Sequence, residues 1–223
     1  MLSRTRIKVC GITNPDDAAM ALAMGVDALG FIFAVKSPRV VSPEQAKEII
    51  AQISPFFVPP LFTTIGVFVN QDPAEIVEIT KYCGLTTVQL HGDESPDFCR
   101  QLADDVTPCR IMKAFRVHPE TNEHDFSPYQ DVVSAFLLDT WHPALRGGSG
   151  EHFDWRRIAS FKLGRPYILA GGLRPDNVGM AIRQARPFAV DINSGVEDEP
   201  GRKNHGKLKE VIKQVCLADA DEA

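Results

Sequence analysis

The residues from Ile7 to Thr13 read IKVCGIT and place a lysine and a cysteine two positions apart in a short apolar run. Side chains alternate across a β-strand, so Lys8 and Cys10 point to the same side of a strand formed here. A thiolate is a base and a nucleophile, and a neighbouring ammonium stabilises it. The competing interpretation is a small apolar cysteine in a core beside a lysine at the start of the strand, since buried free cysteine is common.

Three further side chains with acid–base or recognition chemistry follow apolar runs: Arg39 in AVKSPRVV, His91 in QLHG and Asp139 in LLDT. A thiol base and a carboxyl acid could work on different parts of one substrate. A cysteine hydrolase would instead need a histidine beside Cys10, and nothing in the spacing requires His91 to reach it. His91 and Asp139 are too few to hold a metal ion. Taken singly, each residue could simply be a satisfied loop residue.

Two glycine-bearing segments are the most specific single signal. LAGGL carries Gly171 and Gly172, and DINSGVE carries Ser194 and Gly195. Glycine lets a phosphate approach the backbone N–H groups closely, and barrel enzymes hold phosphate in their last two strand–helix loops. We therefore expect a phosphorylated small-molecule substrate that is held without a lysine-rich cradle. A third glycine cluster, RGGSGEHFDW at 146–155, could fold over the ligand.

Eight short apolar runs rich in β-branched and aromatic residues would position these side chains. Helical patterns follow most of the runs, with the fifth helix expected somewhere in 119–134. Several helices are predicted to begin with a capping residue, a proline and an acid. The expected strands lie at 7–10, 26–33, 64–69, 87–90, 110–115, 136–139, 167–170 and 188–192, and the helix starts are NPDD (14–17), SPEQ (42–45, a capping box), DPAE (72–75), SPDF (95–98) and RPDN (174–177).

Eight alternating units over 223 residues predict an α/β protein with a single (β/α)8 TIM barrel spanning 1–223. In such a barrel the catalytic groups lie at the carboxyl ends of the strands. A doubly wound open sheet is the alternative, but the first strand is not followed by the G-x-G-x-x-G motif that such a sheet often carries. The proline-rich run SPFFVPPLFT (54–63) would lie on the opposite face and is interpreted as a packing loop or a contact surface.

Composition narrows the function further. Hydrophobic residues make up 44% and charged residues 24%, as in an ordinary globular protein, and the net charge of −5 offers no basic surface for nucleic acid. No apolar run approaches the ~20 residues that cross a bilayer, so no membrane partner is expected. The five cysteines are odd in number and lack C-x-x-C spacing, which argues against disulfides or a zinc site and for the cytoplasm.

The chain resembles the phosphoribosylanthranilate isomerase family of tryptophan biosynthesis in nine motifs that occur in order between about residues 6 and 216. They are KVCGIT, FAVKSPRVVS, VFVN, VQLHGDE, LLDT, GGSGEHFDW, LAGGL, PDNV and FAVDINSGVE. The family's fold is the (β/α)8 barrel. The resemblance implies a cofactor-independent Amadori rearrangement that converts N-(5′-phosphoribosyl)anthranilate into 1-(2-carboxyphenylamino)-1-deoxyribulose 5-phosphate, by a monomer or a homodimer.

The resemblance also implies roles for individual residues. Cys10 falls on the family's general base, Asp139 on its general acid, and Arg39 on the arginine that pairs with the anthranilate carboxylate. The phosphate group falls on the two glycine segments, and His91 is assigned to substrate binding. Asn193 stands where many relatives carry serine, a mild change because the phosphate contacts there are largely backbone.

Closure of the barrel predicts an ion-pair partner for Lys8. The last strand pairs with the first, so Asp191 in FAVDI should lie beside Lys8 at the floor of the pocket and form a buried ion pair with it. The pair would hold the ammonium where it supports a thiolate at Cys10, and both residues are assigned to the substrate site. The alternative is that Asp191 caps the DINSG turn and Lys8 reaches a backbone carbonyl.

Three rival functions differ at these residues. Sugar isomerases that perform the same rearrangement in histidine biosynthesis carry aspartate at the position of Cys10. Phosphosugar epimerases need metal-binding histidines on several strands. A non-catalytic phosphosugar-binding barrel would keep the glycine segments while losing the acid or the base, and both are present here.

Overall fold

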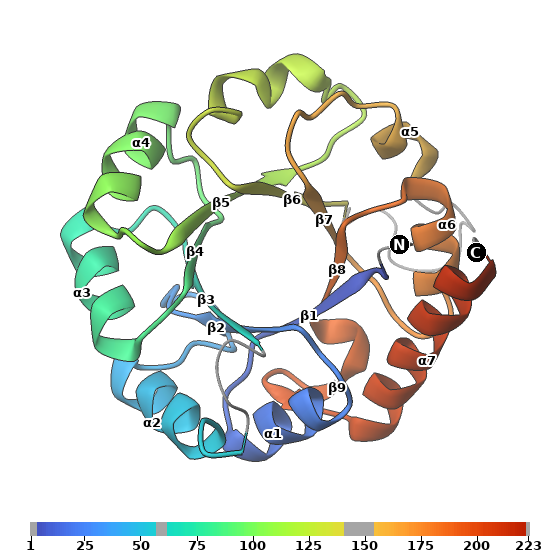
Figure 1. Cartoon of the computed structure of the whole chain (residues 1–223), viewed down its shortest axis with the longest axis horizontal. Coiled ribbons are helices and arrows are strands. Elements are labelled where there is room, and N and C mark those ends of the chain that lie inside the picture. Colours follow the sequence, from blue (N-terminus) through green and yellow to red (C-terminus); the bar gives the residue numbers. More distant parts are fainter. Residues whose placement is uncertain (1–3, 57–61, 141–153, 222–223) are drawn as a thin grey trace.

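The computed structural model describes residues 4–56, 62–140 and 154–221. Eight parallel strands form a closed ring in chain order, with the last strand pairing with the first (Figure 1). The predicted (β/α)8 barrel is therefore confirmed. The strands are β1 (Arg6–Cys10), β2 (Ala28–Ile32), β3 (Thr63–Phe68), β4 (Thr87–Leu90), β5 (Arg110–Arg116), β6 (Ala135–Asp139), β7 (Tyr167–Ala170) and β8 (Ala189–Ile192).

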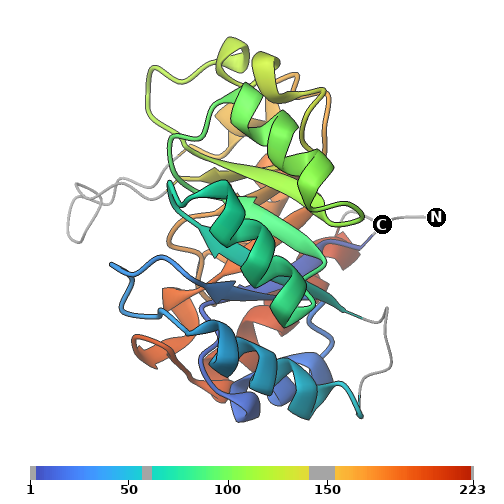
Figure 2. The same ribbon diagram turned by 90° about the vertical axis from the view of Figure 1, so that its left-hand side faces the viewer.

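Helices surround the ring of strands, as Figure 2 shows from the side. The capping residues predicted before the first four helices, Asn14, Ser42, Asp72 and Ser95, each accept a hydrogen bond from the first turn. The capping box at Ser42 is only half formed, because the Gln45 side chain donates to the carbonyl of Thr13. The helices are α1 (Pro15–Ala23), α2 (Pro43–Ile53), α3 (Pro73–Cys83), α4 (Pro96–Asp105), α5 (Arg156–Ala159), α6 (Val178–Ala185) and α7 (His205–Asp221).

Two helix predictions were wrong in detail. The segment 119–134 forms two short 3-10 helices, η1 (Glu123–Asp125) and η2 (Ser127–Tyr129), because Pro128 has no N–H to continue a longer helix. RPDN at 174–177 is a turn, and α6 begins only at Val178. The Asn177 side chain explains the delay, since it accepts from the Arg174 N–H and donates to the Gly172 carbonyl.

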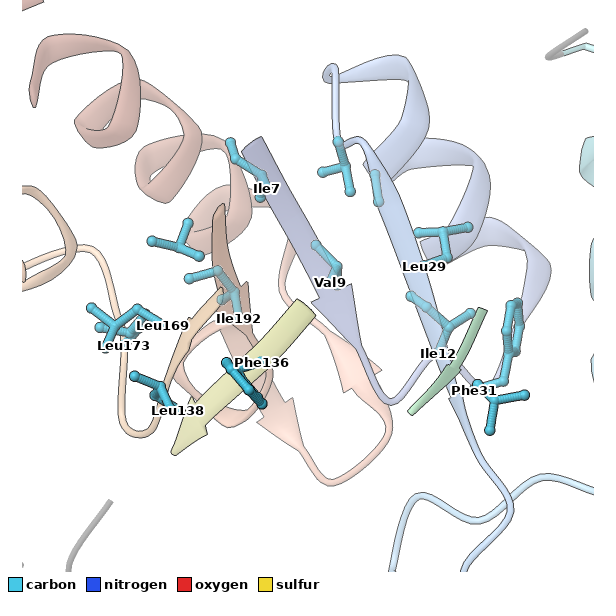
Figure 3. Packing of buried hydrophobic residues seen from close by; sticks show 14 of the residues in the cluster. Ile7, Val9, Ile12, Leu29, Phe31, Phe136, Leu138, Leu169, Leu173 and Ile192 are labelled. Carbon is cyan, nitrogen blue, oxygen red and sulfur yellow. The ribbon is translucent and has the colours of Figure 1, made fainter. Parts of the chain in front are cut away.

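Strand residues alternate between the helices and the barrel interior. On β1, Ile7 and Val9 point outward into the layer between strands and helices, where Val9 lies beside Leu29 of β2 and Ile192 of β8 (Figure 3). Lys8 and Cys10 therefore point inward, as predicted. The interior below the strand ends is filled by a smaller apolar cluster: Ile65, Met112, Ala114, Leu137, Ile168, Ala170 and Ala189.

One hairpin was not predicted. A 3-10 turn, η4 (Ser194–Val196), follows β8 and leads into β9 (Glu197–Glu199) and β10 (Arg202–Lys203), which pair antiparallel. Figure 1 shows β9 beside α1. Hydrogen bonds from Thr13 Oγ1 to the Gly201 carbonyl and from the Lys203 N–H to Asp17 join the hairpin to the start of α1.

Two predictions fall largely on residues that the structure does not describe. Only 154–155 of the glycine cluster at 146–155 are described, and 57–61 of the run 54–63 are not. Phe56, at the described edge of that run, is 78% exposed. Among the described helices, none is long and apolar enough to cross a membrane.

Candidate active site

A cavity of about 350 Å³ opens at the carboxyl ends of the strands. Of the ten side chains or glycines predicted for the site, nine line this cavity, and the tenth, Lys8, lies deeper in the barrel. Within the described residues, no group of three or more His, Cys, Asp or Glu could hold a metal ion. The nine predicted residues that line the cavity are Cys10, Arg39, His91, Asp139, Gly171, Gly172, Asp191, Ser194 and Gly195.

The predicted Lys8–Asp191 ion pair is confirmed. β1 and β8 pair with Lys8 opposite Asp191, and Lys8 Nζ lies 2.7 Å from Asp191 Oδ2. The two side chains are only 3% and 8% exposed, so the pair is buried at the floor of the cavity. Burial alone would lower the pKa of Lys8, but Asp191 and Cys10 raise it above its ordinary value, so the ammonium stays charged.

Cys10 is buried beside this pair. Burial raises the pKa of its thiol above the ordinary value, while Lys8 pulls it down without cancelling the effect of burial. The expected help from Lys8 is present, but burial still favours the neutral thiol. Gly30, the partner of Cys10 on β2, makes room for both groups, because a Cβ there would lie 2.8 Å from Cys10 Sγ and 3.3 Å from Lys8 Cε.

Asp139 ends β6, which is not a neighbour of β1 in the ring, and so it lines a different part of the cavity wall from Cys10. His91 lies near Asp139, with His91 Nε2 3.7 Å from Asp139 Oδ2. The sequence left open whether His91 could reach the thiol, and the structure pairs it with the carboxyl group. About a quarter of each side chain is exposed, so both can meet a ligand.

Arg39 lines the cavity but is also held from behind by Glu197. Its Nε lies 2.9 and 3.0 Å from the two carboxylate oxygens, and its Nη2 lies 2.6 Å from Oε2. Lys203 Nζ binds the same carboxylate at 2.7 Å. Burial alone would raise the pKa of Glu197, but Arg39 and Lys203 lower it below its ordinary value. The guanidinium is thereby oriented, and its Nη1–Nη2 edge remains to bind a ligand carboxylate.

The two glycine segments meet in the lining of the same cavity. Gly171 and Gly172 follow β7 with φ values of 99° and 62°, a left-handed backbone that favours glycine. Gly195 has a different reason: a Cβ there would lie 1.9 Å from the carbonyl oxygen of Leu173. The two loops thus touch through their backbones and present them to the cavity, as expected for a phosphate site.

Three residues around this site were missed by the sequence analysis: Gln89, Glu197 and Lys203. The inward direction of the Gln89 side chain could have been predicted from the period-two alternation of β4, which points it to the same side as His91. Pro200–Gly201 between charged residues was the available signal for the hairpin. A turn signal does not predict which residues the hairpin contacts, so it could not identify Glu197 and Lys203 as part of the site. The arrangement as a whole combines a carboxyl group, a thiol, a guanidinium and two glycine loops around one cavity.

Comparison with known proteins agrees with this chemistry. The family model described as N-(5′-phosphoribosyl)anthranilate (PRA) isomerase matches residues 7–214. A curated relative, the N-(5′-phosphoribosyl)anthranilate isomerase of Gloeothece citriformis, is 43% identical over 210 residues, which is 94% of this chain and 93% of the relative.

Solved structures give the same answer. One is a phosphoribosyl anthranilate isomerase in complex with reduced 1-(o-carboxyphenylamino)-1-deoxyribulose 5-phosphate, with 40% identity, a TM-score of 0.79 and coverage of 96% of this chain and 99% of that one. Another is the Thermotoga maritima enzyme, described as monomers generated from a dimeric phosphoribosylanthranilate isomerase. It has 37% identity, a TM-score of 0.77 and coverage of 95% and 98%.

Proposed function

Because the chain belongs to the N-(5′-phosphoribosyl)anthranilate isomerase family, we propose that Cys10 and Asp139 are the general base and general acid of its reaction. The chain is an isomerase of tryptophan biosynthesis that converts N-(5′-phosphoribosyl)anthranilate into 1-(2-carboxyphenylamino)-1-deoxyribulose 5-phosphate. The observation that carries the assignment is one cavity lined by a thiol, a carboxyl group, a guanidinium and two glycine loops.

The proposed mechanism has two proton transfers. Asp139 protonates the ring oxygen of the ribose, and the C1′–O bond breaks to give an open-chain protonated Schiff base. The iminium makes the C2′ proton acidic, and the Cys10 thiolate removes it to give an enolamine. The enolamine then relaxes to the ketone. Acid and base act on different atoms of the sugar, which agrees with their origin on strands that are not neighbours.

The buried lysine supports the second transfer. Lys8 favours the thiolate form of Cys10 without being a proton acceptor itself, since its own pKa is raised by Asp191 and Cys10. Asp191 holds the ammonium in place from β8. His91 lies beside the acid and completes the substrate-facing wall.

Each of the two anionic groups of the substrate is proposed to bind a different set of cavity residues. Arg39 would bind the anthranilate carboxylate, and Gly171, Gly172, Ser194 and Gly195 would bind the phosphate through their backbone. The relative bound to a reduced carboxyphenylamino deoxyribulose phosphate supports this, because that ligand carries both anionic groups. Within the described lining residues, Arg39 is the sole lysine or arginine, which leaves the phosphate to the glycine loops.

The proposal extends to the state of the chain in the cell. One catalytic domain spans the chain and works in the cytoplasm, where its five free cysteines stay reduced. Its partners are the phosphorylated substrate and at most a second copy of itself, since a Thermotoga maritima relative is described as dimeric. Sedimentation equilibrium across a range of concentrations separates monomer from homodimer.

The activity is tested directly by mixing the purified protein with freshly generated phosphoribosylanthranilate. Conversion should be seen as loss of the anthranilate-type fluorescence, with the deoxyribulose phosphate product identified by mass spectrometry. Addition of a chelator should leave the rate unchanged, because the proposed steps use side chains alone. Fluorescence that decays no faster than in a protein-free solution would contradict the proposal.

Arg39→Ala is expected to weaken substrate binding by roughly 10- to 100-fold, the usual effect of losing a charge-assisted hydrogen-bonded pair. Glu197 keeps Lys203 as a partner, so the variant should still fold. The measurement compares KM for the substrate with inhibition by an aniline analogue that lacks the carboxylate. Native enzyme should prefer the carboxylate compound, and the variant should not.

Arg202→Ala is the matched control, because it removes an exposed guanidinium from the β9–β10 hairpin that carries Glu197, the partner of Arg39. It should leave both KM and the preference for the carboxylate unchanged. If Arg39→Ala kept the native preference, the carboxylate would have to bind elsewhere in the cavity.

A further inference from the structure

Gln89 is a buried polar side chain in the catalytic cavity to which the proposed mechanism gives no task. It lies on β4, is 1% exposed and lines the cavity together with His91, two residues further along the strand. Its neighbours across the sheet are apolar, Val67 on β3 and Met112 on β5. An amide in these surroundings needs hydrogen-bond partners for both its nitrogen and its oxygen.

The nitrogen of this amide has a partner. Gln89 Nε2 lies 2.9 Å from His91 Nδ1. An amide nitrogen can only donate, so Nδ1 must accept the hydrogen bond and carries no proton. The single proton of the neutral imidazole is then on Nε2. Gln89 therefore determines which ring nitrogen of His91 can donate.

The proton on Nε2 faces the proposed acid. Nε2 lies 3.7 Å from Asp139 Oδ2, and a shortening of ~0.7 Å would turn this contact into a hydrogen bond. When Nε2–H of His91 donates to Oδ2, the acidic proton of Asp139 is placed on Oδ1. The same hydrogen bond stabilises the carboxylate that forms when this proton is transferred to the substrate. The opposite tautomer would offer Asp139 an acceptor instead.

The oxygen of the amide has no partner. Gln89 Oε1 is one of the few buried side-chain atoms in the described residues without a hydrogen bond, and Asp191 Oδ1, in the same cavity, is another. A buried acceptor is costly when it is left unpaired. Gln89 and Asp191 line the same cavity as Cys10 and Asp139, the residues proposed to act on the sugar. The donors that a ribose brings there are its hydroxyl groups.

We propose that Gln89 sets the proton position on His91 and accepts a hydrogen bond from a ribose hydroxyl of the substrate. It is thus a positioning residue for the acid side of the site and a substrate-binding residue. The inference rests on the proposed role of Asp139, but its first part concerns the enzyme before substrate binds and can be measured without turnover.

The tautomer is measured by ¹⁵N NMR of histidine-labelled enzyme, since protonated and unprotonated ring nitrogens resonate far apart. His91 is assigned by the signal that disappears in His91→Asn. In native enzyme Nδ1 should be unprotonated and Nε2 protonated. Gln89→Glu presents an acceptor to Nδ1, so Nδ1 should become protonated. Gln89→Met, which has no donor and only a weakly accepting sulfur, should leave a mixture of tautomers.

Kinetics test the substrate contact. Gln89→Met should raise KM by about 3- to 10-fold, the usual effect of one lost neutral hydrogen bond. Gln89→Glu should lower kcat by about 10-fold or more, because it moves the proton away from the acid. Met112→Leu, which changes an apolar neighbour of Gln89 at the same depth, is the control and should leave KM, kcat and the His91 signals unchanged.

Either of two results would overturn the inference: a native His91 protonated on Nδ1, or a Gln89→Met variant with native KM. The native spectrum decides the tautomer even if a variant fails to fold. If the native enzyme shows the expected tautomer while Asp139→Asn retains full activity, the role of Asp139 is wrong and the assignment of the Gln89–His91 pair stands.

Discussion

Cys10→Ser and Asp139→Asn should each lower kcat by about 100-fold or more while changing substrate affinity little. The serine hydroxyl is a far weaker acid than a thiol and cannot supply the alkoxide needed to take the C2′ proton. Asparagine keeps the shape of Asp139 and has no proton to give to the ring oxygen. Steady-state kinetics with freshly made substrate give kcat, and binding of a non-reacting product analogue gives affinity.

Controls for these variants are available in the same chain. Cys216→Ser changes an exposed cysteine on α7, and Asp131→Asn an exposed aspartate ahead of β6. Both should keep native kcat. If a site variant lost binding of the product analogue as strongly as it lost turnover, its residue would be a binding group and its catalytic role would be wrong.

Lys8→Met should cost the protein about 3–5 kcal/mol of unfolding free energy, because it leaves the Asp191 carboxylate buried without its partner. The double variant Lys8→Met, Asp191→Leu should recover most of that loss, since it removes both charges. Urea unfolding measures both. Arg183→Met, which breaks an exposed pair with Asp221, should cost at most about 1 kcal/mol and serves as the control.

The same variant tests the effect of Lys8 on the base. Lys8 lowers the pKa of Cys10, so its removal raises that pKa, which burial already holds above the ordinary value. Alkylation of a thiol follows its thiolate fraction. The alkylation rate of Cys10 is followed by mass spectrometry of its peptide. The midpoint of its increase with pH should therefore lie at a higher pH in Lys8→Met than in the native enzyme. Overlapping curves would make Lys8 a purely structural residue.

The parts of the fold that local rules govern could be predicted from the sequence. Strand alternation placed Lys8 and Cys10 inside, and barrel closure placed Asp191 opposite Lys8, because both rules are independent of side-chain packing. The helix beginning at RPDN was misplaced since Asn177 bonds back to the glycine segment rather than capping a helix. That choice depends on the neighbouring Gly171–Gly172 segment, whose conformation no local pattern describes.

Arg39 shows that local patterns also fail to predict contacts between distant segments within the site. Its position at the cavity could be predicted, whereas its partner could not. Glu197 lies 158 residues further along the chain and reaches Arg39 only because the β9–β10 hairpin folds onto α1. Gln89 faced the cavity by simple alternation, but its contact with His91 depends on rotamers that the sequence does not fix.

The closure of β8 on β1 also governs when the enzyme becomes active. The proposed base comes from the first strand, the proposed acid from the sixth and the glycine loops from the last two, so the cavity is complete only when the whole ring has formed. During synthesis on a ribosome, Lys8 has no counter-charge until Asp191 has been translated. The buried pair can therefore form only when the last strand is present. We expect activity only from the complete ring.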